Sequence, residues 1–436
     1  MGLGVLGGGV ATAKWLVGEG ADLTVTDLKD KKYLEPSLEK LKNLEIKYVL
    51  GKHKKEDFLN NGVIVINPDV PADNKFVNLA RENGKQIENE LTLFFKYAVY
   101  KTAIGITGTR GKTTTTNWIG AILKNAGREV AVLGNDPEKP FLSEINNCTK
   151  DTIAVIETPS YQLEIMGESG LAPHVAVITN LYQDHLARHK TMENYALTKA
   201  NIFKNQKRDD FLILNKNNKW TRFFIDLKPK SKVTFSSAEA LPKFNQEEFI
   251  RQYGHHNLVN FLTAASACLA LGISGEEILK ATTLLPQIKF RQELVYRKDG
   301  LQIYNDTAAT SPEATIVALE RFSKRGQKLI LITGGTDREL DFKKWSEVVK
   351  KFLASDNLVF LSGSATEKMK KELGWKIDEF GSLEECFQSA ISKAKKEEGV
   401  TIVFSPSSKS FEKFKNEFDR GEKFNNLVKD LRQVEL

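Results

Sequence analysis

The segment 105–114 carries the residue types and spacing of a phosphate-binding loop. It reads GITGTRGKTT, with glycines at 105, 108 and 111 ahead of Lys112 and Thr113. Glycines let backbone N–H groups turn toward phosphate oxygens, and the helix expected next directs its positive end at them. The Lys112 ammonium neutralises charge, and the Thr113 hydroxyl is a ligand for Mg²⁺. We therefore predict a triphosphate site, although Ile106 stands where the common G-x-x-x-x-G-K-T pattern has its first glycine.

Two further side chains are expected at the carboxyl edge of the same parallel sheet, where ligands of such sheets bind. Glu157 ends the apolar run 153–156, and its carboxylate is a candidate Mg²⁺ ligand. His185 follows the run 175–179 and is a second candidate ligand. A strand-end surface acid and a packing histidine are the alternatives. Three other histidines are predicted to be surface or packing residues: His53, His174 and His189.

A pair of asparagines is expected on one side of a later helix. Asn257 and Asn260 lie one helical turn apart, so their amides face the same side. Helix capping by Asn257 is the alternative. Lys199, in a helix predicted at 192–203, is by default a solvated surface residue.

The N-terminal glycines match a dinucleotide-binding pattern. Residues 2–7 read GLGVLG, and Asp27 ends the second predicted strand where such folds place a ribose-binding acid. Taken alone, this pattern favours NAD, and a glycine-rich turn without a ligand is the alternative. Met1 directly precedes the first glycine, so either the first strand is short and its pocket weakened, or the start lies upstream.

Length and composition describe an ordinary globular chain. The 436 residues are 41% hydrophobic and 27% charged, and this length is expected to form about three domains. Apolar runs stay below the roughly 18 residues of a membrane helix, and the N-terminus lacks a basic region and a cleavage site. The cysteines lie far apart without metal spacing, so we expect reduced thiols in the cytoplasm.

The net charge of +7 does not predict binding to nucleic acid. Lysines mix with glutamates on predicted helices, as at 368–372 and 393–398, so solvated helix faces explain most of the charge. The sequence has no RNA-binding motif or basic arm with interleaved aromatic residues. A modest positive excess suits an anionic nucleotide substrate. We expect small-molecule partners and neither nucleic acid nor membrane.

Alternating apolar runs and helical stretches predict an α/β chain with parallel sheets. A βαβ pattern fills residues 1–90, and a second α/β unit with the phosphate loop fills 91–286. Residues 287–436 begin with a predicted hairpin, 293–297 and 301–304, turned at Asp299-Gly300, and continue as βαβ. These boundaries define the three predicted domains.

Six motifs in order along the chain resemble the Mur ligase family. They are TGTRGKT at 107–113, ETPSYQLE at 157–164, NLYQDHL at 180–186, GHHNLVN at 254–260, NDT at 305–307 and the stretch 405–421. Segments 160–164, 331–342 and 410–421 are most similar to the family members that add D-glutamate.

The resemblance implies a fold and an activity. It implies a Rossmann-like N-terminal domain that binds UDP, a central P-loop-type ATPase domain and a C-terminal Rossmann-like domain for the amino acid. The implied reaction is ATP-dependent addition of D-glutamate to UDP-N-acetylmuramoyl-L-alanine through an acyl phosphate, in cytoplasmic peptidoglycan precursor synthesis. Its cofactors are ATP, two Mg²⁺ ions and a carbamylated lysine, in a monomer whose domains close around the substrates.

The resemblance also implies which residues serve each ligand. For ATP they are Gly108, Thr109, Arg110, Gly111, Lys112, Thr113, Thr114, Asn257, Asn260, Arg291 and Asp306. For the UDP substrate they are Gly4, Val5, Leu6, Asp27, Asn67, Asn135 and Ser160. For glutamate they are Thr310, Arg338 and Ser410. For metal they are Thr113, Glu157, His185 and carbamylated Lys199, and the catalytic set is Lys112, His185 and Lys199.

Four positions depart from the family pattern. Pro159 replaces a serine, Ala187 an aspartate, and Ala308 and Arg338 each a lysine. The last two exchange one cation for a forked one near the predicted glutamate carboxylates. L-glutamate addition to the same acceptor, or the reaction of another Mur-type ligase, therefore stays open.

Three other protein classes are weighed against this family. The N-terminal glycines favour an NAD-dependent oxidoreductase, but that class of protein would give the phosphate loop, Glu157 and His185 no role. A non-catalytic nucleotide-binding protein would account for the departures as lost chemistry. A folylpolyglutamate synthase shares the central motifs, but the predicted N-terminal domain argues against it.

Overall fold

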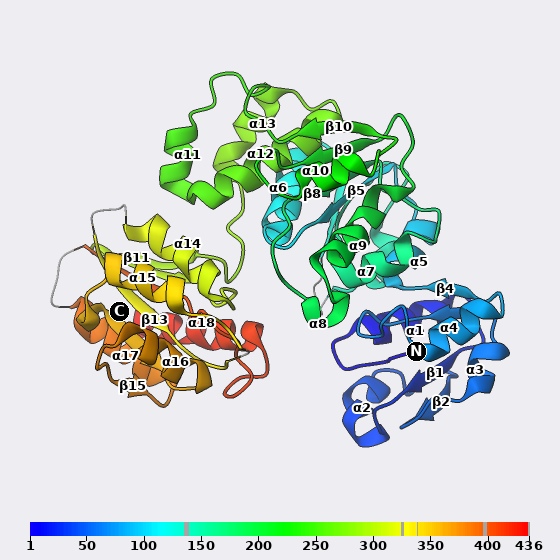
Figure 1. Cartoon of the computed structure of the whole chain (residues 1–436), viewed down its shortest axis with the longest axis horizontal. Helices are drawn as coiled ribbons and strands as arrows, with labels where there is room; N and C mark the ends of the chain where they lie inside the picture. The colour runs from blue at the N-terminus through cyan, green and yellow to red at the C-terminus, as the bar shows by residue number, and fades with distance from the viewer. Residues whose placement is uncertain (135–138, 324–326, 338, 396–398, 435–436) are drawn as a thin grey trace. The chain divides into compact units, whose positions relative to one another are not determined.

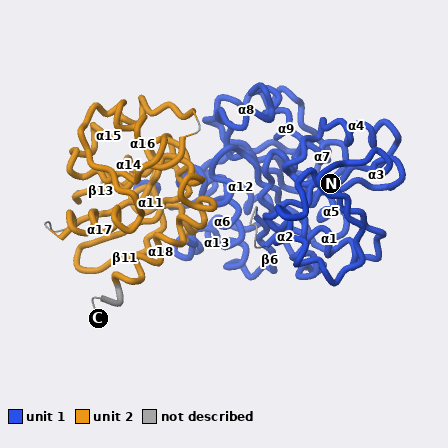
Figure 2. The backbone as a smooth tube through the Cα atoms, turned by 90° about the horizontal axis from the view of Figure 1, so that it is seen from below, with its two compact units in different colours: residues 1–247, 257–286 blue, residues 248–256, 287–436 orange. Residues whose placement is uncertain are grey.

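The computed structural model describes residues 1–134, 139–323, 327–337, 339–395 and 399–434 (Figure 1). Two predicted substrate residues, Asn135 and Arg338, lie outside the described residues. The chain divides into two compact units, one of residues 1–247 with 257–286 and one of residues 248–256 with 287–436 (Figure 2). The predicted boundary near residue 90 falls inside unit 1 and stays a prediction.

The N-terminal part of unit 1 pairs its strands two by two. Its elements are α1 (Gly8–Gly18), β1 (Thr24–Asp27), α2 (Lys31–Glu39), β2 (Lys47–Leu50), α3 (Lys55–Leu59), β3 (Val63–Val65), α4 (Lys75–Glu82) and β4 (Gln86–Glu88). β1 pairs with β2 and β3 with β4, both in parallel. The βαβ pattern expected for this region is thereby confirmed.

The first residues connect these two strand pairs. Residues 1–4, all of them described, lie outside any strand. Met1 N donates to Val65 O and Gly2 N donates to Thr26 O, each at 2.8 Å. The segment before the glycine-rich turn therefore bridges β3 and β1 through single backbone hydrogen bonds.

Helix α2 differs from its prediction. The residue pattern favours a helix at 35–44, whereas α2 runs from Lys31 to Glu39. Asp30 caps the helix because its carboxylate accepts a hydrogen bond from Tyr33 N at 2.8 Å. That cap begins the helix earlier than apolar spacing indicates.

The remainder of unit 1 surrounds a six-stranded parallel sheet in the order β10-β9-β8-β5-β7-β6. Its strands are β5 (Thr102–Thr107), β6 (Val130–Leu133), β7 (Ile153–Glu157), β8 (Val175–Ile178), β9 (Phe211–Leu214) and β10 (Lys232–Phe235). Its helices are α5 (Glu90–Tyr97), α6 (Lys112–Asn125), α7 (Ser160–Met166), α8 (Leu186–His189), α9 (Met192–Lys204), α10 (Thr221–Asp226), α12 (His255–Ala270) and α13 (Gly275–Ala281). β7 and β8 are buried along their whole length, as expected for central parallel strands.

Unit 2 carries a second six-stranded sheet in the order β11-β12-β16-β13-β14-β15. Its strands are β11 (Glu293–Lys298), β12 (Leu301–Asn305), β13 (Lys328–Thr333), β14 (Leu358–Leu361), β15 (Glu379–Phe380) and β16 (Val400–Phe404). Its helices are α14 (Pro312–Phe322), α15 (Lys343–Phe352), α16 (Ser364–Leu373), α17 (Leu383–Ala394) and α18 (Glu417–Val434), and α11 (Gln246–Tyr253) crosses from unit 1. The predicted hairpin is confirmed, with Asp299 and Gly300 both at positive φ.

Alternate residues of β13 pack against different helices. Ile330 and Ile332 belong to the core cluster that includes α17 and α18, whereas Leu329 and Leu331 belong to the cluster of α14, α15 and α16. This alternation is the period of a strand covered on both faces. Within the described part of the chain, no helix is both long enough and apolar enough to cross a membrane.

Candidate active site

The predicted phosphate loop connects β5 to α6, as its sequence indicates. Gly111 caps the helix with φ 80°, and Gly108 has φ 145°. A Cβ on Gly108 would lie 1.9 Å from Thr179 Oγ1, and a Cβ on Gly111 would lie 2.2 Å from Asn260 Oδ1. Neither position accepts a side chain without local displacement. Gly108, Thr109, Arg110 and Gly111 form the loop, and Lys112, Thr113 and Thr114 form the first turn of α6.

Strand order places this loop at a change of direction in the sheet. β5 lies between β7 and β8, with Ile106 opposite Glu157 and Thr107 opposite Ile178. The loop is also held to the segment after β8, since Arg110 N donates to Asn180 Oδ1 at 2.9 Å. Ligands of open α/β sheets bind at such a switch point, beyond the carboxyl ends of the strands.

Two lysines converge on the loop backbone. Lys112 Nζ donates to the carbonyl oxygens of Gly108 at 3.1 Å and Thr109 at 3.2 Å. Lys199 Nζ donates to the same Gly108 oxygen at 2.9 Å, and it lies 4.5 Å from the ring centroid of Tyr195. The default expectation of a surface position for Lys199 is wrong, because only 1% of this residue is exposed.

The buried position of Lys199 changes its acid–base behaviour. Burial lowers the pKa of Lys199 well below its ordinary value, and the positive charge of Lys112 lowers it further. The carboxylates of Asp184 and Glu157 act in the opposite direction. The amine is therefore biased toward its neutral, nucleophilic form.

Two of the predicted metal residues, Glu157 and His185, lie on segments that flank the loop. Glu157 ends β7 and is buried. His185 precedes α8 with φ 53°, and its ring centroid lies 6.1 Å from those of Tyr161 and Tyr195. Among the described residues, no group of three His, Cys, Asp or Glu side chains could hold a metal alone.

This donor set still fits Mg²⁺ next to a nucleotide. Mg²⁺ keeps several waters and is usually held by one or two carboxylates together with substrate phosphates. Glu157 offers a buried carboxylate, and Thr113 offers a hydroxyl in the first turn of α6. Hard oxygen donors at a phosphate loop suit that ion.

The asparagine pair lies against the same loop. Asn260 Nδ2 donates to Asn257 Oδ1 at 3.0 Å, which confirms that the two amides share a side of α12. Asn257 is the third residue of α12, so the alternative that it caps the helix is wrong. The close approach of Asn260 to Gly111 ties the helix to the phosphate loop.

The N-terminal glycine turn collects most of the predicted UDP-substrate residues. Gly4 N donates to Asp27 Oδ2 at 3.1 Å, and Lys29 N donates to Asp27 Oδ1 at 2.8 Å. Asn67 Nδ2 lies 3.9 Å from the position of a Cβ on Gly4. Val5 and Leu6 are exposed, Leu6 at 63%. The turn thus combines a buried carboxylate with exposed apolar side chains.

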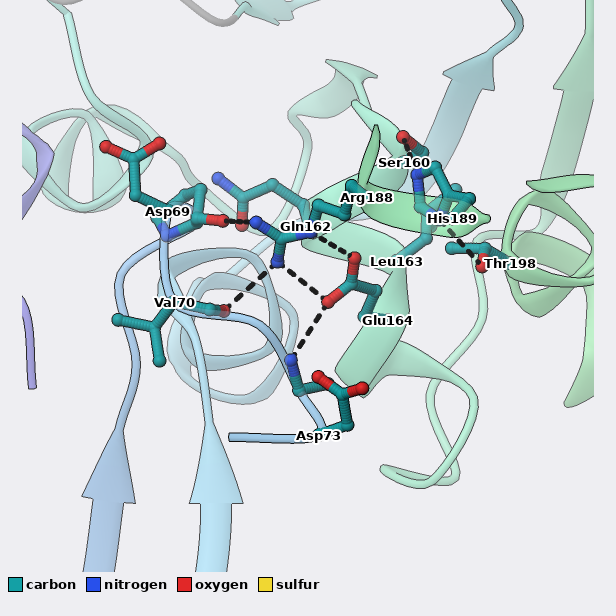
Figure 3. A network of polar contacts seen from close by, with 12 residues as sticks. Asp69, Val70, Asp73, Ser160, Gln162, Leu163, Glu164, Arg188, His189 and Thr198 are labelled. Atoms are coloured by element: carbon teal, nitrogen blue, oxygen red, sulfur yellow. Dashed lines mark hydrogen bonds and ion pairs between the residues drawn. The ribbon is translucent and has the colours of Figure 1, made fainter. Parts of the chain in front are cut away.

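Ser160 begins α7 and contacts a buried histidine (Figure 3). Ser160 Oγ lies 3.0 Å from His189 Nε2, and His189 stacks on Tyr195 with ring centroids 4.9 Å apart. Burial lowers the pKa of His189 to about 4. The packing interpretation of His189 is confirmed, but its hydrogen bond to Ser160 was not predicted.

Unit 2 holds a separate group of predicted residues. Asp306 accepts hydrogen bonds from Ser405 Oγ at 2.7 Å and Gln292 N at 3.0 Å. Burial raises the pKa of Asp306 to about 7, and the charge of Arg291 opposes that rise. Arg291 and Asp306 are therefore close enough to interact electrostatically within this unit.

Thr310 and Ser410, two of the three predicted glutamate residues, adjoin a serine-rich loop at 405–410. Lys409 Nζ donates to Thr310 Oγ1 at 3.3 Å, which brings Thr310 to this loop. Ser410 is buried, and its Oγ has no hydrogen-bond partner among the described residues. An orphan hydroxyl at this place can bind a polar group of a ligand.

Comparison with known proteins identifies the family of this chain. Residues 1–89 match the family described as "Mur ligase MurD-like, N-terminal domain", residues 106–269 match "Mur ligase middle domain" and residues 290–408 match "Mur ligase, glutamate ligase domain". A UDP-N-acetylmuramoylalanine–D-glutamate ligase from Roseiflexus sp. (strain RS-1) is 35% identical over 99% of this chain and 98% of its own length. The chain belongs to the Mur ligase family.

Other Mur ligases resemble it over similar lengths. The UDP-N-acetylmuramoylalanine–D-glutamate ligase of Clostridioides difficile (strain 630) is 32% identical over 97% of this chain and 96% of its own. The structure of the UDP-N-acetylmuramate-alanine ligase MurC of Thermotoga maritima aligns with a TM-score of 0.57 at 17% identity, over 98% of each chain. That structural similarity supports the three-domain Mur ligase fold.

Three residues of this Mur ligase were missed by sequence reasoning. Lys409 contacts Thr310, and buried Arg420 donates to the carbonyl oxygens of Thr307 and Ser408. Arg188 forms an ion pair with Glu164. Isolated basic residues give no periodic signal, so only the motif segments around them marked these regions.

Proposed function

We propose that this Mur ligase joins D-glutamate to UDP-N-acetylmuramoyl-L-alanine, with conversion of ATP to ADP and phosphate. The observation that carries the proposal is the convergence of Lys112 and buried Lys199 on the carbonyl oxygen of Gly108, in a glycine loop at the sheet's switch point. The relatives' printed names supply the acceptor and the amino acid. The product belongs to peptidoglycan precursor synthesis in the cytoplasm.

The first step is phosphorylation of the acceptor. A carboxylate oxygen of the alanyl group attacks the γ-phosphorus of ATP, the bond from that phosphorus to the bridging oxygen breaks, and ADP leaves. Lys112 and the N–H groups that begin α6 stabilise negative charge on the transferred phosphoryl oxygens. Asn257 and Asn260, together with Arg291 and Asp306 of unit 2, are assigned to ATP.

The second step forms the amide. The glutamate amine, once neutral, attacks the acyl-phosphate carbonyl, and inorganic phosphate leaves with the oxygen that the carboxylate supplied. Thr310, Arg338 and Ser410 are assigned to glutamate. The buried Ser410 hydroxyl, without a partner among the described residues, supports that assignment.

Mg²⁺ fits the oxygen donors of the loop region, and we assign one ion to Thr113 and Glu157 and a second to His185 and carbamylated Lys199. Its positive charge, when bound, would stabilise anionic oxygens of the nucleotide. The protein's share of this work is to hold a buried carboxylate and a helix-start hydroxyl at the carboxyl edge of one sheet.

We assign Lys199 as a carbamylated residue. Carbamylation requires a neutral amine, since its nitrogen lone pair attacks the carbon of CO₂ and loses a proton to water. Burial and the charge of Lys112 favour that neutral form. The resulting carbamate is an anion beside Lys112, so the pair gains attraction in place of repulsion. Loss of activity in Lys199→Ala, with partial rescue by added formate or acetate, is the expected outcome.

The remaining predicted residues are assigned to the UDP substrate. Gly4, Val5, Leu6 and Asp27 lie at the N-terminal turn and are assigned to uridine, because exposed apolar side chains there suit a flat base. Asn67 and Asn135 are assigned to the diphosphate and sugar, and Ser160 is assigned to the UDP substrate. The three domains at 1–90, 91–286 and 287–436 and a monomeric state complete the proposal.

ADP release tests this function. The enzyme is supplied with ATP, Mg²⁺, the UDP-muramoyl-alanine acceptor and, in turn, D-glutamate, L-glutamate or a diamino acid. We expect ADP release that requires the acceptor together with D-glutamate. Release with L-glutamate alone would assign the other stereochemistry, and ATP binding without acceptor-dependent turnover would overturn the ligase proposal.

A further inference from the structure

An ion pair fastens the loop after β3 to the central part of unit 1 (Figure 3). Arg188 donates to both carboxylate oxygens of Glu164, through Nε at 2.6 Å and Nη2 at 2.8 Å. The same guanidinium donates to Pro68 O at 2.8 Å and Val70 O at 3.0 Å. Glu164 Oε2 also accepts a hydrogen bond from Ala72 N at 3.1 Å. The Arg188–Glu164 pair thus holds the loop 68–72, because the guanidinium and the carboxylate each form hydrogen bonds with its backbone.

Both side chains of this pair are mostly shielded from solvent. The side chains of Arg188 and Glu164 are 21% and 13% exposed, and the guanidinium carbon lies 5.8 Å from the centroid of the Tyr161 ring. Bidentate guanidinium–carboxylate pairs are geometrically specific and stronger than a surface ammonium contact. The loop they hold directly follows Asn67, a predicted UDP-substrate residue.

The helix that carries Arg188 also carries the candidate catalytic histidine at its start. α8 has four residues, with His185 immediately before it and Arg188 and His189 at its end. His189 contacts Ser160 on α7, and its Nδ1 lies 3.5 Å from Thr198 Oγ1, next to Lys199 on α9. The short helix α8 is therefore anchored both to the loop 68–72 and to α9, the helix that carries Lys199.

We infer that Arg188, with Glu164 as its partner, is a positioning residue. It couples the loop 68–72, which follows the predicted UDP-substrate residue Asn67, to His185 and Lys199. This inference rests on the proposed function. Displacement of α8 would move His185 and loop 68–72 together, since the guanidinium is bonded to that loop. Its role is to set the acceptor carboxylate against the phosphoryl group, which is where small misplacements lower the rate most.

Arginine is required here in place of lysine. A lysine can keep one contact with Glu164, but its ammonium has no planar fork to reach two carboxylate oxygens and two backbone carbonyls at once. Arg188→Lys therefore preserves the positive charge but removes the simultaneous contacts with both carboxylate oxygens and both backbone carbonyls. We expect a rise in the acceptor KM and a fall in kcat, together about tenfold to a hundredfold in kcat/KM, with little change in the ATP KM.

Arg81 offers a matched control. It also connects the N-terminal part of unit 1 to the central part, through an ion pair with Glu168 at 3.2 Å, but it lies on α4 and not on α8. Its contact with Ala72 O, at 3.5 Å, stays within the N-terminal part. Arg81→Lys tests whether fastening of these parts alone matters. Glu164→Gln provides a second variant at the proposed pair if Arg188→Lys folds poorly.

The experiment combines kinetics with hydrogen exchange. The wild-type enzyme, Arg188→Lys, Glu164→Gln, their double variant and Arg81→Lys are compared for kcat, both KM values and amide protection. The proposal expects acceptor-specific kinetic loss and non-additive effects at 164 and 188, with faster exchange in both 68–72 and 184–199. Equal effects in Arg81→Lys, or lowered melting temperature with unchanged kinetics, would overturn it. If the wild type shows no turnover, the proposed function fails, and the exchange pattern still decides whether Arg188 couples the two segments.

Discussion

Lys112 and Lys199 share one hydrogen-bond acceptor, the carbonyl oxygen of Gly108, at 3.1 Å and 2.9 Å. Two ammonium groups that converge on one atom repel each other, and one of them is buried. The pKa of Lys199 is lowered first by burial and then by Lys112. The site thus combines the Lys112 cation, which can bind phosphate, with buried Lys199, whose amine is biased toward its neutral form.

The lowered pKa of Lys199 predicts a specific pH dependence of stability. In CO₂-free buffer the unfolded state binds this proton up to its ordinary pKa, while the folded state has already lost it. Stability therefore rises with pH between the lowered pKa and the ordinary one. Lys199→Met removes this dependence, so the variant should exceed the wild type in stability at neutral pH, by a margin that shrinks toward pH ~10.

Urea unfolding across that pH range measures the effect. Lys204→Met, at the exposed end of the same helix, is the control and should follow the wild-type curve. A Lys199→Met curve parallel to that of the wild type at every pH would show that the amine is charged in the folded protein.

Glu90 predicts the opposite trend. Burial raises its pKa to about 7, although Leu142 N donates to its carboxylate at 3.2 Å. Between pH ~4.5 and ~7 the unfolded state ionises first, so wild-type stability falls through this window. Glu90→Gln should remove on the order of 3 kcal/mol of that fall. Glu56→Gln, an exposed acid in the first turn of α3, should leave the fall intact.

Chemical denaturation at pH ~4 and ~8 gives the difference directly. If Glu90→Gln and the wild type lose the same stability between these values, the carboxyl group is not held protonated by its surroundings.

Gly111→Ala should abolish nucleotide binding. The new Cβ would lie 2.2 Å from Asn260 Oδ1, at a backbone φ of 80°. Gly127, at the other end of α6, has φ 71° and nothing within 4 Å of its Cβ position. Both variants should lose about 1–2 kcal/mol of stability from strain, but Gly127→Ala should keep its ATP affinity. Titration calorimetry with ADP distinguishes them, and equal affinity in both variants would remove the loop from the nucleotide site.

Lys112→Ala should lower turnover by at least about a hundredfold, since the transferred phosphoryl group loses its nearest cation. Lys124→Ala, in the last turn of the same helix and exposed, should retain activity. ADP formation measured for both under saturating substrates provides the comparison. Near-normal turnover in Lys112→Ala would remove this lysine from the mechanism.

Much of the fold could be predicted because local patterns determine it. The runs at 153–156 and 175–179 become buried central strands, and Asp299-Gly300 adopts the positive φ angles that a hairpin turn needs. Glycine spacing likewise predicted the loop between β5 and α6. In each case the residues that determine the feature are neighbours in the sequence.

Other features depend on residues far apart in the sequence. Lys199 looks like a solvated helix residue until the fold places it under Gly108, 91 positions away. Arg188 reaches Pro68, 120 positions away, and no periodicity marks that contact. The start of α2 follows from a single cap, Asp30, whose hydrogen bond outweighs apolar spacing. These features arise from tertiary contacts, which the sequence pattern alone does not express.

The most direct test of the central claim follows one oxygen atom. The acceptor is prepared with a heavy-oxygen label in its alanyl carboxylate and supplied with ATP, Mg²⁺ and D-glutamate. Since that carboxylate attacks the γ-phosphorus, one labelled oxygen should appear in the released inorganic phosphate, in step with amide formation. Unlabelled phosphate alongside full amide formation would contradict an acyl-phosphate route and the account of the glycine loop built on it.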